Sequence, residues 1–221
     1  PYLAFGYDGS INSRLTYHRA KGTDNWSVID ARNRSDFESF TVAGYDPLDT
    51  TKLLVLAHNG RNTQGLWSFD PQENEFTELL YGRSDGDVVA VRMHSNSYTE
   101  PDLITGVAFY DGRQRKFEWF DGQEKAIYEQ LESLIPFADR FRIVDRSRDG
   151  NTMIIENSGP RDPGTFYLLK NSELNVVGSA KPAIASKNLA DVKAITYESS
   201  DGMKIKGFVT IPNSEPPYPL V

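Results

Sequence analysis

Short runs of alternating apolar and polar residues, rich in β-branched and aromatic side chains, constrain the fold of this chain most strongly. They follow one another about every 10–12 residues and are separated by Asp, Asn, Gly and Pro, which favour turns. This spacing predicts an antiparallel all-β protein. The clearest runs are KLLVLAH (52–58), GLWSFD (65–70), EFTELL (75–80), DVVAVRM (87–93), LITGVAFY (103–110), RKFEWF (115–120), FRIVDR (141–146), TMIIEN (152–157), TFYLLK (165–170) and LNVVGS (174–179).

One helix interrupts the strands. The segment GQEKAIYEQLESLIP (122–136) places Ile127, Leu131 and Leu134 at helical spacing. Asp121 is the expected N-cap, and Pro136 ends the helix.

Two long segments share one order of features. DPLDTTKLLVLAH…QGLWSFDPQENEFTELL and DRSRDGNTMIIEN…PGTFYLLKNSELNVVGS each contain a polar turn, an apolar strand, a loop, an aromatic strand, a turn and a last strand. They begin roughly 100 residues apart, twice the ~45-residue period of a propeller blade. We therefore expect a partial β-propeller with about four blades of four antiparallel strands in residues 1–180. A generic antiparallel sandwich is the alternative.

Charge and composition exclude several classes of protein. With 24 Lys and Arg against 31 Asp and Glu, the net charge is −7, which disfavours nucleic acid as a partner. No run of apolar residues is long enough to predict a membrane partner. The chain has no cysteine, which excludes disulfides and thiolate metal ligands but leaves the compartment open, with cytoplasm and periplasm both compatible.

The C-terminal region has a different character. Residues 181–191 lack alternation and are interpreted as a linker. Residues 192–198 and 203–211 then predict a β-hairpin around Asp201-Gly202, a pair typical of type I′ turns. This hairpin belongs to no blade.

The segment AITYESSDGMKIKGFVTIPNSEPPYPLV (194–221) resembles the S9 (prolyl oligopeptidase) family of serine peptidases, close to its acylaminoacyl-peptidase and dipeptidyl-peptidase-like branches. The likeness lies in a strand, Asp-Gly, a strand with I-x-G, a proline and then P-L-V. The preceding FRIVDRSRDGNTMIIENSGPRDPGTFYLLK (141–170) is similar to the final blade of that family, and the earlier blades resemble it more loosely.

This resemblance implies a propeller that caps an α/β-hydrolase domain. Residues 1–180 are then propeller blades, 181–191 a linker, and 192–221 the first hairpin and strand start of the hydrolase domain. The family's Ser, Asp and His would follow Val221, so we expect no catalytic residue in this chain. The resemblance also implies that the parent protein hydrolyses short peptides, with the propeller limiting access to them.

Gly82-Arg83-Ser84-Asp85-Gly86 matches the G-x-S-x-G nucleophile elbow of serine hydrolases. An elbow needs a helix after the serine, but a strand is predicted at 87–93. It also needs an acid and a histidine well downstream, and only His94 follows Ser84. We interpret the segment as a turn in which glycine takes a positive φ.

Four other features have both a structural and a functional interpretation. His18, His58 and His94 are a blade apart and could converge on a metal, although surface or turn positions are favoured. The segment 146–152 resembles a calcium loop but is expected to be a plain turn. Trp26, Trp67 and Trp119 are expected to pack blades, with a sugar-binding platform as the alternative. Arg161, in the loop 158–164, is the one substrate-binding candidate, because a guanidinium can bind a carboxylate in fork geometry.

The leading function is therefore a non-catalytic propeller that positions short peptides for a hydrolase domain. A TolB-like propeller scaffold that binds a protein and a glycan-binding propeller are the alternatives. No cofactor and no metal are predicted. A propeller cut to about four blades would expose apolar blade faces and strand edges, so we expect the chain to self-associate.

Overall fold

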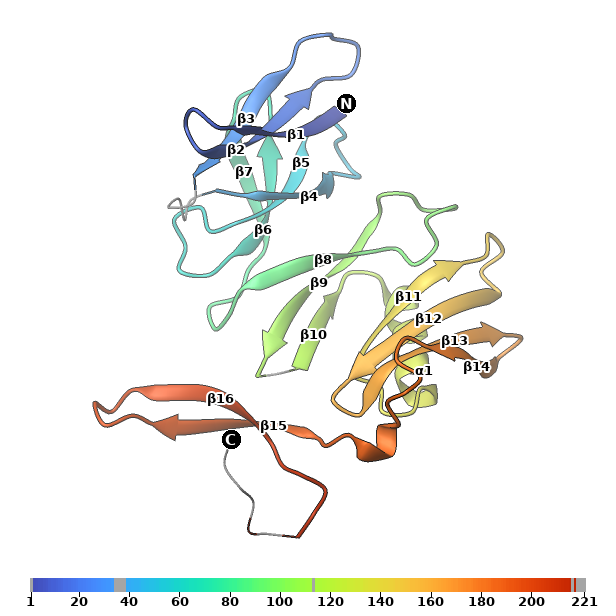
Figure 1. Cartoon of the computed structure of the whole chain (residues 1–221). Coiled ribbons are helices and arrows are strands. Elements are labelled where there is room, and N and C mark those ends of the chain that lie inside the picture. The colour runs from blue at the N-terminus through green and yellow to red at the C-terminus, as the bar shows by residue number, and fades with distance from the viewer. Residues whose placement is uncertain (1, 34–38, 113, 216, 218–221) are drawn as a thin grey trace. The chain divides into compact units, whose positions relative to one another are not determined.

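The computed structural model describes residues 2–33, 39–112, 114–215 and 217 (Figure 1). The described residues form antiparallel strands throughout, with one α-helix and one 3₁₀ turn (Ser186–Asn188). Within them no helix is both long and apolar enough to cross a membrane. The chain divides into two compact units, Pro1–Met93 with Asp102–Tyr110, and His94–Pro101 with Asp111–Val221.

Four sheets precede the C-terminal hairpin, and each is built from consecutive strands. Two have four strands, in the orders β4-β5-β6-β7 and β11-β12-β13-β14, and two have three, β1-β2-β3 and β10-β9-β8. The strands are β1 (Tyr2–Asp8), β2 (Ser13–Arg19), β3 (Ser27–Asn33), β4 (Thr41–Tyr45), β5 (Leu53–Ala57), β6 (Gly65–Asp70), β7 (Glu75–Tyr81), β8 (Val88–Met93), β9 (Ile104–Asp111), β10 (Gln114–Trp119), β11 (Arg140–Arg146), β12 (Thr152–Gly159), β13 (Asp162–Lys170) and β14 (Glu173–Ser179).

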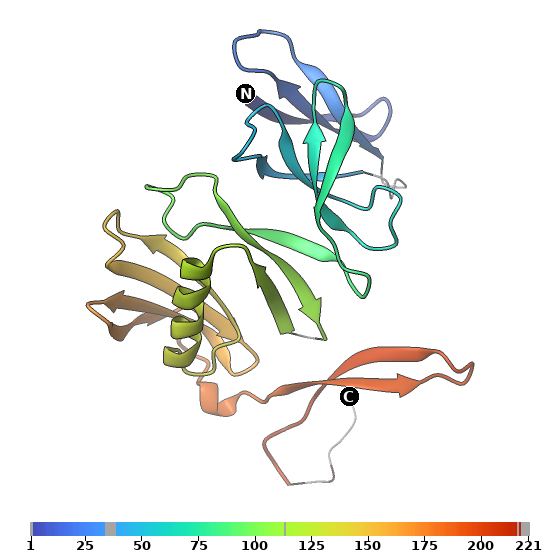
Figure 2. The same cartoon turned by 180° about the vertical axis from the view of Figure 1, so that it is seen from behind.

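The expected fold class, an all-β partial propeller, is confirmed. The two segments that share one order of features form the two four-stranded sheets, and each strand pairs with the next along the chain (Figure 2). Consecutive antiparallel strands are the form of a propeller blade. The sheets β1–β3 and β8–β10 have one strand fewer than expected. We call the sheet β1–β3 the first blade.

The core of the first unit explains the apolar run at 53–57. Every residue of β5 is buried, and alternate side chains enter two different apolar clusters. Leu53, Val55 and Ala57 pack with Phe40 and Phe69. Leu54 and Leu56 pack in the other cluster, which also contains Leu66, Val88, Ile104 and Val107. A strand buried on both faces needs apolar residues at every position, which is why this run does not alternate.

The second unit contains the helix α1 (Gly122–Leu134). Asp121 caps it as expected and accepts hydrogen bonds from the backbone N–H groups of Gln123 and Glu124. The expected apolar stripe is partly wrong, since Leu134 is 40% exposed. The buried stripe is Glu124, Tyr128 and Leu131, so a carboxylate occupies a position where an apolar side chain was expected. Leu131 packs with Ile135, Met153, Ile155 and Tyr167.

The C-terminal hairpin pairs β15 (Val192–Glu198) with β16 (Lys204–Thr210), as expected. Its turn differs from the predicted type I′, because Gly202 has φ +83° but Asp201 has no positive φ. Gly202 N–H donates to the Ser199 carbonyl and Ser199 N–H to the Met203 carbonyl, both at 2.9 Å. These bonds are those of a three-residue loop with glycine in the left-handed position.

Candidate functional site

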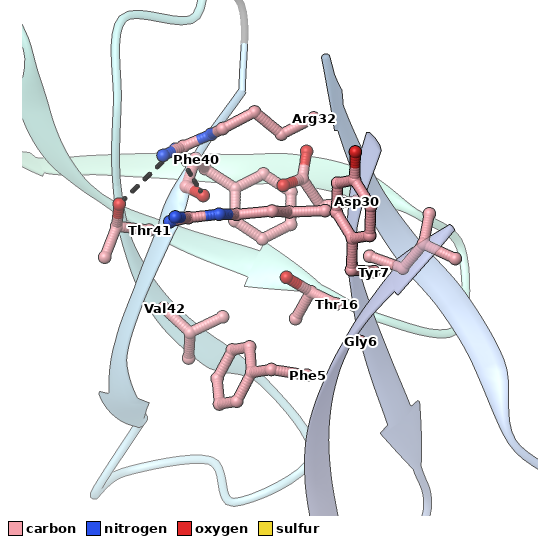
Figure 3. A pocket seen from close by; sticks show the side chains of 11 residues that line it. Phe5, Gly6, Tyr7, Thr16, Asp30, Arg32, Phe40, Thr41 and Val42 are labelled. Atoms are coloured by element: carbon pink, nitrogen blue, oxygen red, sulfur yellow. Dashed lines mark hydrogen bonds between the residues drawn. The ribbon is translucent and has the colours of Figure 1, made fainter. Parts of the chain in front are cut away.

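A cavity of about 630 Å³ lies between the first blade and the start of β4, within the first unit (Figure 3). Its size falls in the range of small-molecule sites. The lining residues are Phe5, Gly6, Tyr7, Arg14, Leu15, Thr16, Asp30, Arg32, Phe40, Thr41 and Val42.

Strand register explains which residues of the first blade face the cavity. Tyr7 is paired with Arg14, and Arg14 with Arg32, so these three residues form one row across β1, β2 and β3. Two residues along the strands, a second row contains Phe5, Thr16 and Asp30. Side chains two apart in a strand share a face. One face of the first blade therefore presents aromatic, cationic and acidic groups together.

Arg32 is held in place by the segment that leads into β4. Its Nη2 donates to the Phe40 carbonyl at 3.1 Å and lies 3.5 Å from Thr41 Oγ1 (Figure 3). Its Nε donates to Ser39 Oγ. Phe40 is itself fixed in the core, with its ring centroid 4.7 Å from that of Phe69. The Arg32 guanidinium is therefore pre-organised at the wall of the cavity.

Arg14 differs from Arg32 in its surroundings. It is exposed, and in the described part of the chain no hydrogen bond or ion pair involves its guanidinium. Asp30 is the one carboxylate of the lining and has its own electrostatic or hydrogen-bonding contact. The lining contains no histidine. The cavity therefore has the chemistry of a binding site for an anionic group, and no nucleophile–base pair.

Ser84 lies in an irregular segment between β7 and β8, so a strand follows it and the elbow geometry is absent. The turn interpretation is confirmed in outline. The expected positive φ is wrong, because neither Gly82 nor Gly86 has one. Instead the Arg83 carbonyl accepts hydrogen bonds from Arg61 Nη2, at 3.1 Å, and from Thr63 Oγ1, and these fix the segment.

The three histidines occupy different environments. His18 is buried in β2, with 4% of its surface exposed, which corrects the expectation of a surface or turn position. Burial lowers the pKa of His18. His94 Nε2 lies 3.6 Å from the buried carboxylate of Glu124. Among the described residues, no group of three or more His, Asp or Glu side chains is arranged to hold a metal ion.

Arg161 lies at the exposed turn between β12 and β13. Its guanidinium is 4.5 Å from the centroid of the Phe137 ring, a cation–π contact. The neighbouring Asp162 is buried and accepts a hydrogen bond from Asn157 Nδ2 at 2.6 Å. The acidic residue of this loop therefore has a structural role, and the substrate-binding role of Arg161 stays a prediction.

The segment 146–152 forms the turn between β11 and β12. Asp149 accepts hydrogen bonds from Ser147 Oγ, Asn151 N and Asn151 Nδ2, which lower the pKa of its carboxyl group. The segment is thus a hairpin turn closed by its own polar side chains, as expected. The contacts of Arg146, the first residue of the segment, were not predicted from the sequence. Its side chain bonds to Ser95 and Glu124.

The tryptophans divide into two kinds. Trp67 donates from Nε1 to the Ala57 carbonyl at 3.0 Å and packs against the core. The Trp119 ring lies 5.0 Å from that of Tyr128 on α1. These two pack within their units, as expected. Trp26 is 46% exposed, with the Arg19 guanidinium 5.4 Å from its ring centroid, so it is not a packing residue.

Sequence reasoning missed the pair Arg14 and Arg32, which are 18 positions apart in the chain. The signal that could have found them is the pairing register, since a hairpin turn near residues 20–26 brings the two positions opposite each other. Neither the turn nor its length was predicted from the sequence.

Comparisons with known proteins give a likeness of fold. No family model and no curated protein matches this chain. A structure from an analysis of two prolyl endopeptidases is similar over 90% of this chain, with TM-score 0.53 and 11% identity. Apo prolyl oligopeptidase B from Galerina marginata is similar over 96% of this chain, with TM-score 0.53 and 11% identity. The chain spans only 28% and 29% of the lengths of these two proteins.

Proposed function

We propose that this chain is the non-catalytic propeller portion of a serine peptidase of the prolyl oligopeptidase family. The observation that carries the proposal is the extent of the structural likeness. Coverage of 96% leaves 4% of 221 residues, about nine, outside the match to prolyl oligopeptidase B. The hairpin of β15 and β16 alone spans residues 192–210, so the likeness extends beyond the blades into it.

The hairpin distinguishes between the candidate functions, because blades alone are common to propellers of many functions. A TolB-like scaffold or a glycan-binding propeller needs no strands after its last blade. In the proposal, residues 1–180 are blades, 181–191 a linker, and 192–221 the start of a hydrolase domain. Ile195 and Tyr197, two positions apart on one face of β15, are 42% and 53% exposed, which fits a hairpin whose apolar face packs on further strands.

The propeller's role in this proposal is to admit short peptides and to exclude folded proteins. In this proposal the catalytic Ser, Asp and His belong to the hydrolase domain and not to the propeller. Within the family, we assign the parent protein to the acylaminoacyl-peptidase and dipeptidyl-peptidase-like branches, which remove residues from a peptide N-terminus. This assignment rests on the residues of 194–221 alone.

Hydrolysis by the complete natural gene product tests the proposal. One recognition sequence is offered as a free octapeptide and within a loop of a folded protein. The expected result is release of residues from the N-terminus of the free peptide and no cleavage of the folded protein. Equal cleavage of peptide and folded protein would remove the gating role. Absence of hydrolysis together with retention of a protein or a glycan would favour the scaffold or the glycan-binding propeller.

A further inference from the structure

The first blade holds two arginines at directly opposed positions. Arg14 on β2 is the register partner of Arg32 on β3, and both line the cavity. Side chains at such positions are close, and like charges placed opposite each other destabilise a sheet. A chain of net charge −7 thus places two of its cations together in a cavity. An anion between the two guanidinium groups would remove this repulsion.

The two guanidinium groups are suited to bind one ligand together. Arg32 uses Nε and Nη2 for hydrogen bonds to the protein, and within the described residues no hydrogen bond joins its Nη1. In the described part of the chain the N–H donors of the Arg14 guanidinium bond to no protein group, so they can bind solvent or a ligand. Arginine binds carboxylates and phosphates through two parallel hydrogen bonds, so a fixed and an adjustable arginine form a clamp for an oxyanion.

The charge of the lining distinguishes between oxyanions. Asp30 lies two positions from Arg32 on the same face, so an anion bound by the two arginines lies near a carboxylate that also has a contact of its own. The charged residues of the lining are Arg14, Arg32 and Asp30, which sum to +1. This charge matches a carboxylate, and a phosphate dianion would leave a net negative charge beside Asp30.

Aromatic side chains lie next to the arginines. The side chains of Phe5 and Tyr7 are 73% and 63% exposed although they line a cavity (Figure 3). Exposed aromatic rings in a concave site provide apolar surface that a ligand can bury. Val42 on β4 adds an aliphatic contact on the opposite wall. The ligand should therefore carry an apolar group next to its carboxylate.

We propose that this cavity binds the C-terminal carboxylate of a short peptide whose last side chain is apolar. Arg14 and Arg32 bind the carboxylate, and Phe5, Tyr7 and Val42 contact the last side chain. The inference rests on the proposed function only in the choice of a peptide as carrier of the carboxylate. A cavity of about 630 Å³ accommodates the end of a peptide and not a folded protein.

Calorimetry on the 221-residue chain tests the inference with matched ligands. N-acetyl-Ala-Ala-Phe is used as the free acid and as the C-terminal amide. Loss of charge-assisted hydrogen bonds should weaken binding of the amide about tenfold or more. Equal affinities of acid and amide would overturn the proposal. N-acetyl-Ala-Glu-Phe amide and inorganic phosphate complete the set, and binding of either as tight as that of the free acid would overturn the terminal-carboxylate assignment.

Two variants locate the binding. Arg14→Gln should weaken binding of the free acid about tenfold, because it removes the adjustable arginine. Arg140→Gln is the matched control, since Arg140 is also an exposed strand residue, on β11. Unchanged thermal unfolding of both variants shows that they fold. Equal effects of the two substitutions would contradict the site. This test needs no hydrolysis, so its outcome is independent of the peptidase assay on the complete gene product.

Discussion

Glu124 on α1 accepts two hydrogen bonds from Ser95, which lies 29 residues earlier in the chain. Ser95 N–H donates to Glu124 Oε2 at 3.0 Å, and Ser95 Oγ donates to Oε1 at 2.7 Å. Arg146 Nη1 lies 3.4 Å from the same Oε1 and donates to Ser95 Oγ at 2.8 Å. Glu124 is 1% exposed. The carboxylate thus joins the segment after β8, the helix and the end of β11 within the second unit.

Replacement of Glu124 should destabilise this unit strongly. Glu124→Ala removes the acceptor of two Ser95 bonds and leaves Arg146, whose side chain is 15% exposed, without its carboxylate. Loss of one partner of a buried ion pair costs about 3–5 kcal/mol. Urea denaturation measures the effect. The control is Glu129→Ala on the exposed face of α1, where Glu129 pairs with Lys125 at 3.7 Å and the loss should be about 0–1 kcal/mol. Similar losses in both variants would show that the buried network contributes little.

The stability of the first unit should fall as the pH falls through the ordinary imidazole range. Burial lowers the pKa of His18 below its ordinary value of 6.5. Below that pH the unfolded chain binds a proton that the folded chain does not, so the free energy of unfolding decreases. His18→Gln should lessen this decrease relative to the wild type, as measured by urea denaturation above and below pH 6.5. The control substitution is His58→Gln, at a half-buried loop position. An identical pH dependence in wild type and His18→Gln would contradict the assignment.

The hairpin β15–β16 should exchange its amide protons faster than β12 and β13. Its side chains Ile195, Tyr197 and Phe208 are exposed, whereas Met153, Ile155 and Tyr167 of β12 and β13 are buried. An isolated hairpin is marginal in water. Hydrogen exchange followed by mass spectrometry on a dilute monomer gives the comparison. Equal protection of the hairpin and of β12–β13 would count against strands that pack on a further domain.

The chain of 221 residues should self-associate. Apolar residues are exposed on the first blade, where Tyr2 lies on β1, and on β14, where Val176 and Val177 are 68% and 61% exposed. Large exposed apolar patches and unpaired strand edges favour association. Light scattering across a concentration series measures it, with a dimer as the expected species. A monomer of 24.9 kDa at high micromolar concentration would contradict an open propeller.

Periodicity predicted the blades because strand alternation and turn residues are local signals. It failed at Glu124, since a charged residue gives no apolar signal, and its burial depends on Ser95 and Arg146 from distant segments. It also failed at Asp201-Gly202. The dipeptide indicated a turn correctly, but the turn type depends on the loop length between β15 and β16.

The cavity could not be predicted from the sequence for a similar reason. Arg14 and Arg32 are unremarkable in the linear chain, and only the β2–β3 register places them opposite each other. The wall opposite is formed by Phe40, Thr41 and Val42, whose position depends on packing of β4 against the first blade. Residues that meet through register and packing need the structure to be found.

Labelling with a fluorophosphonate, which reacts with the nucleophile of serine hydrolases, tests whether this propeller serves a separate peptidase domain. The complete natural gene product, the 221-residue chain and its Ser84→Ala variant are treated in parallel, and the modified serine is identified by mass spectrometry. We expect one labelled serine in the complete product, outside residues 1–221, and no labelling of the two shorter chains. Labelling of Ser84, or of no serine in the complete product, would contradict a propeller that serves a separate serine peptidase domain.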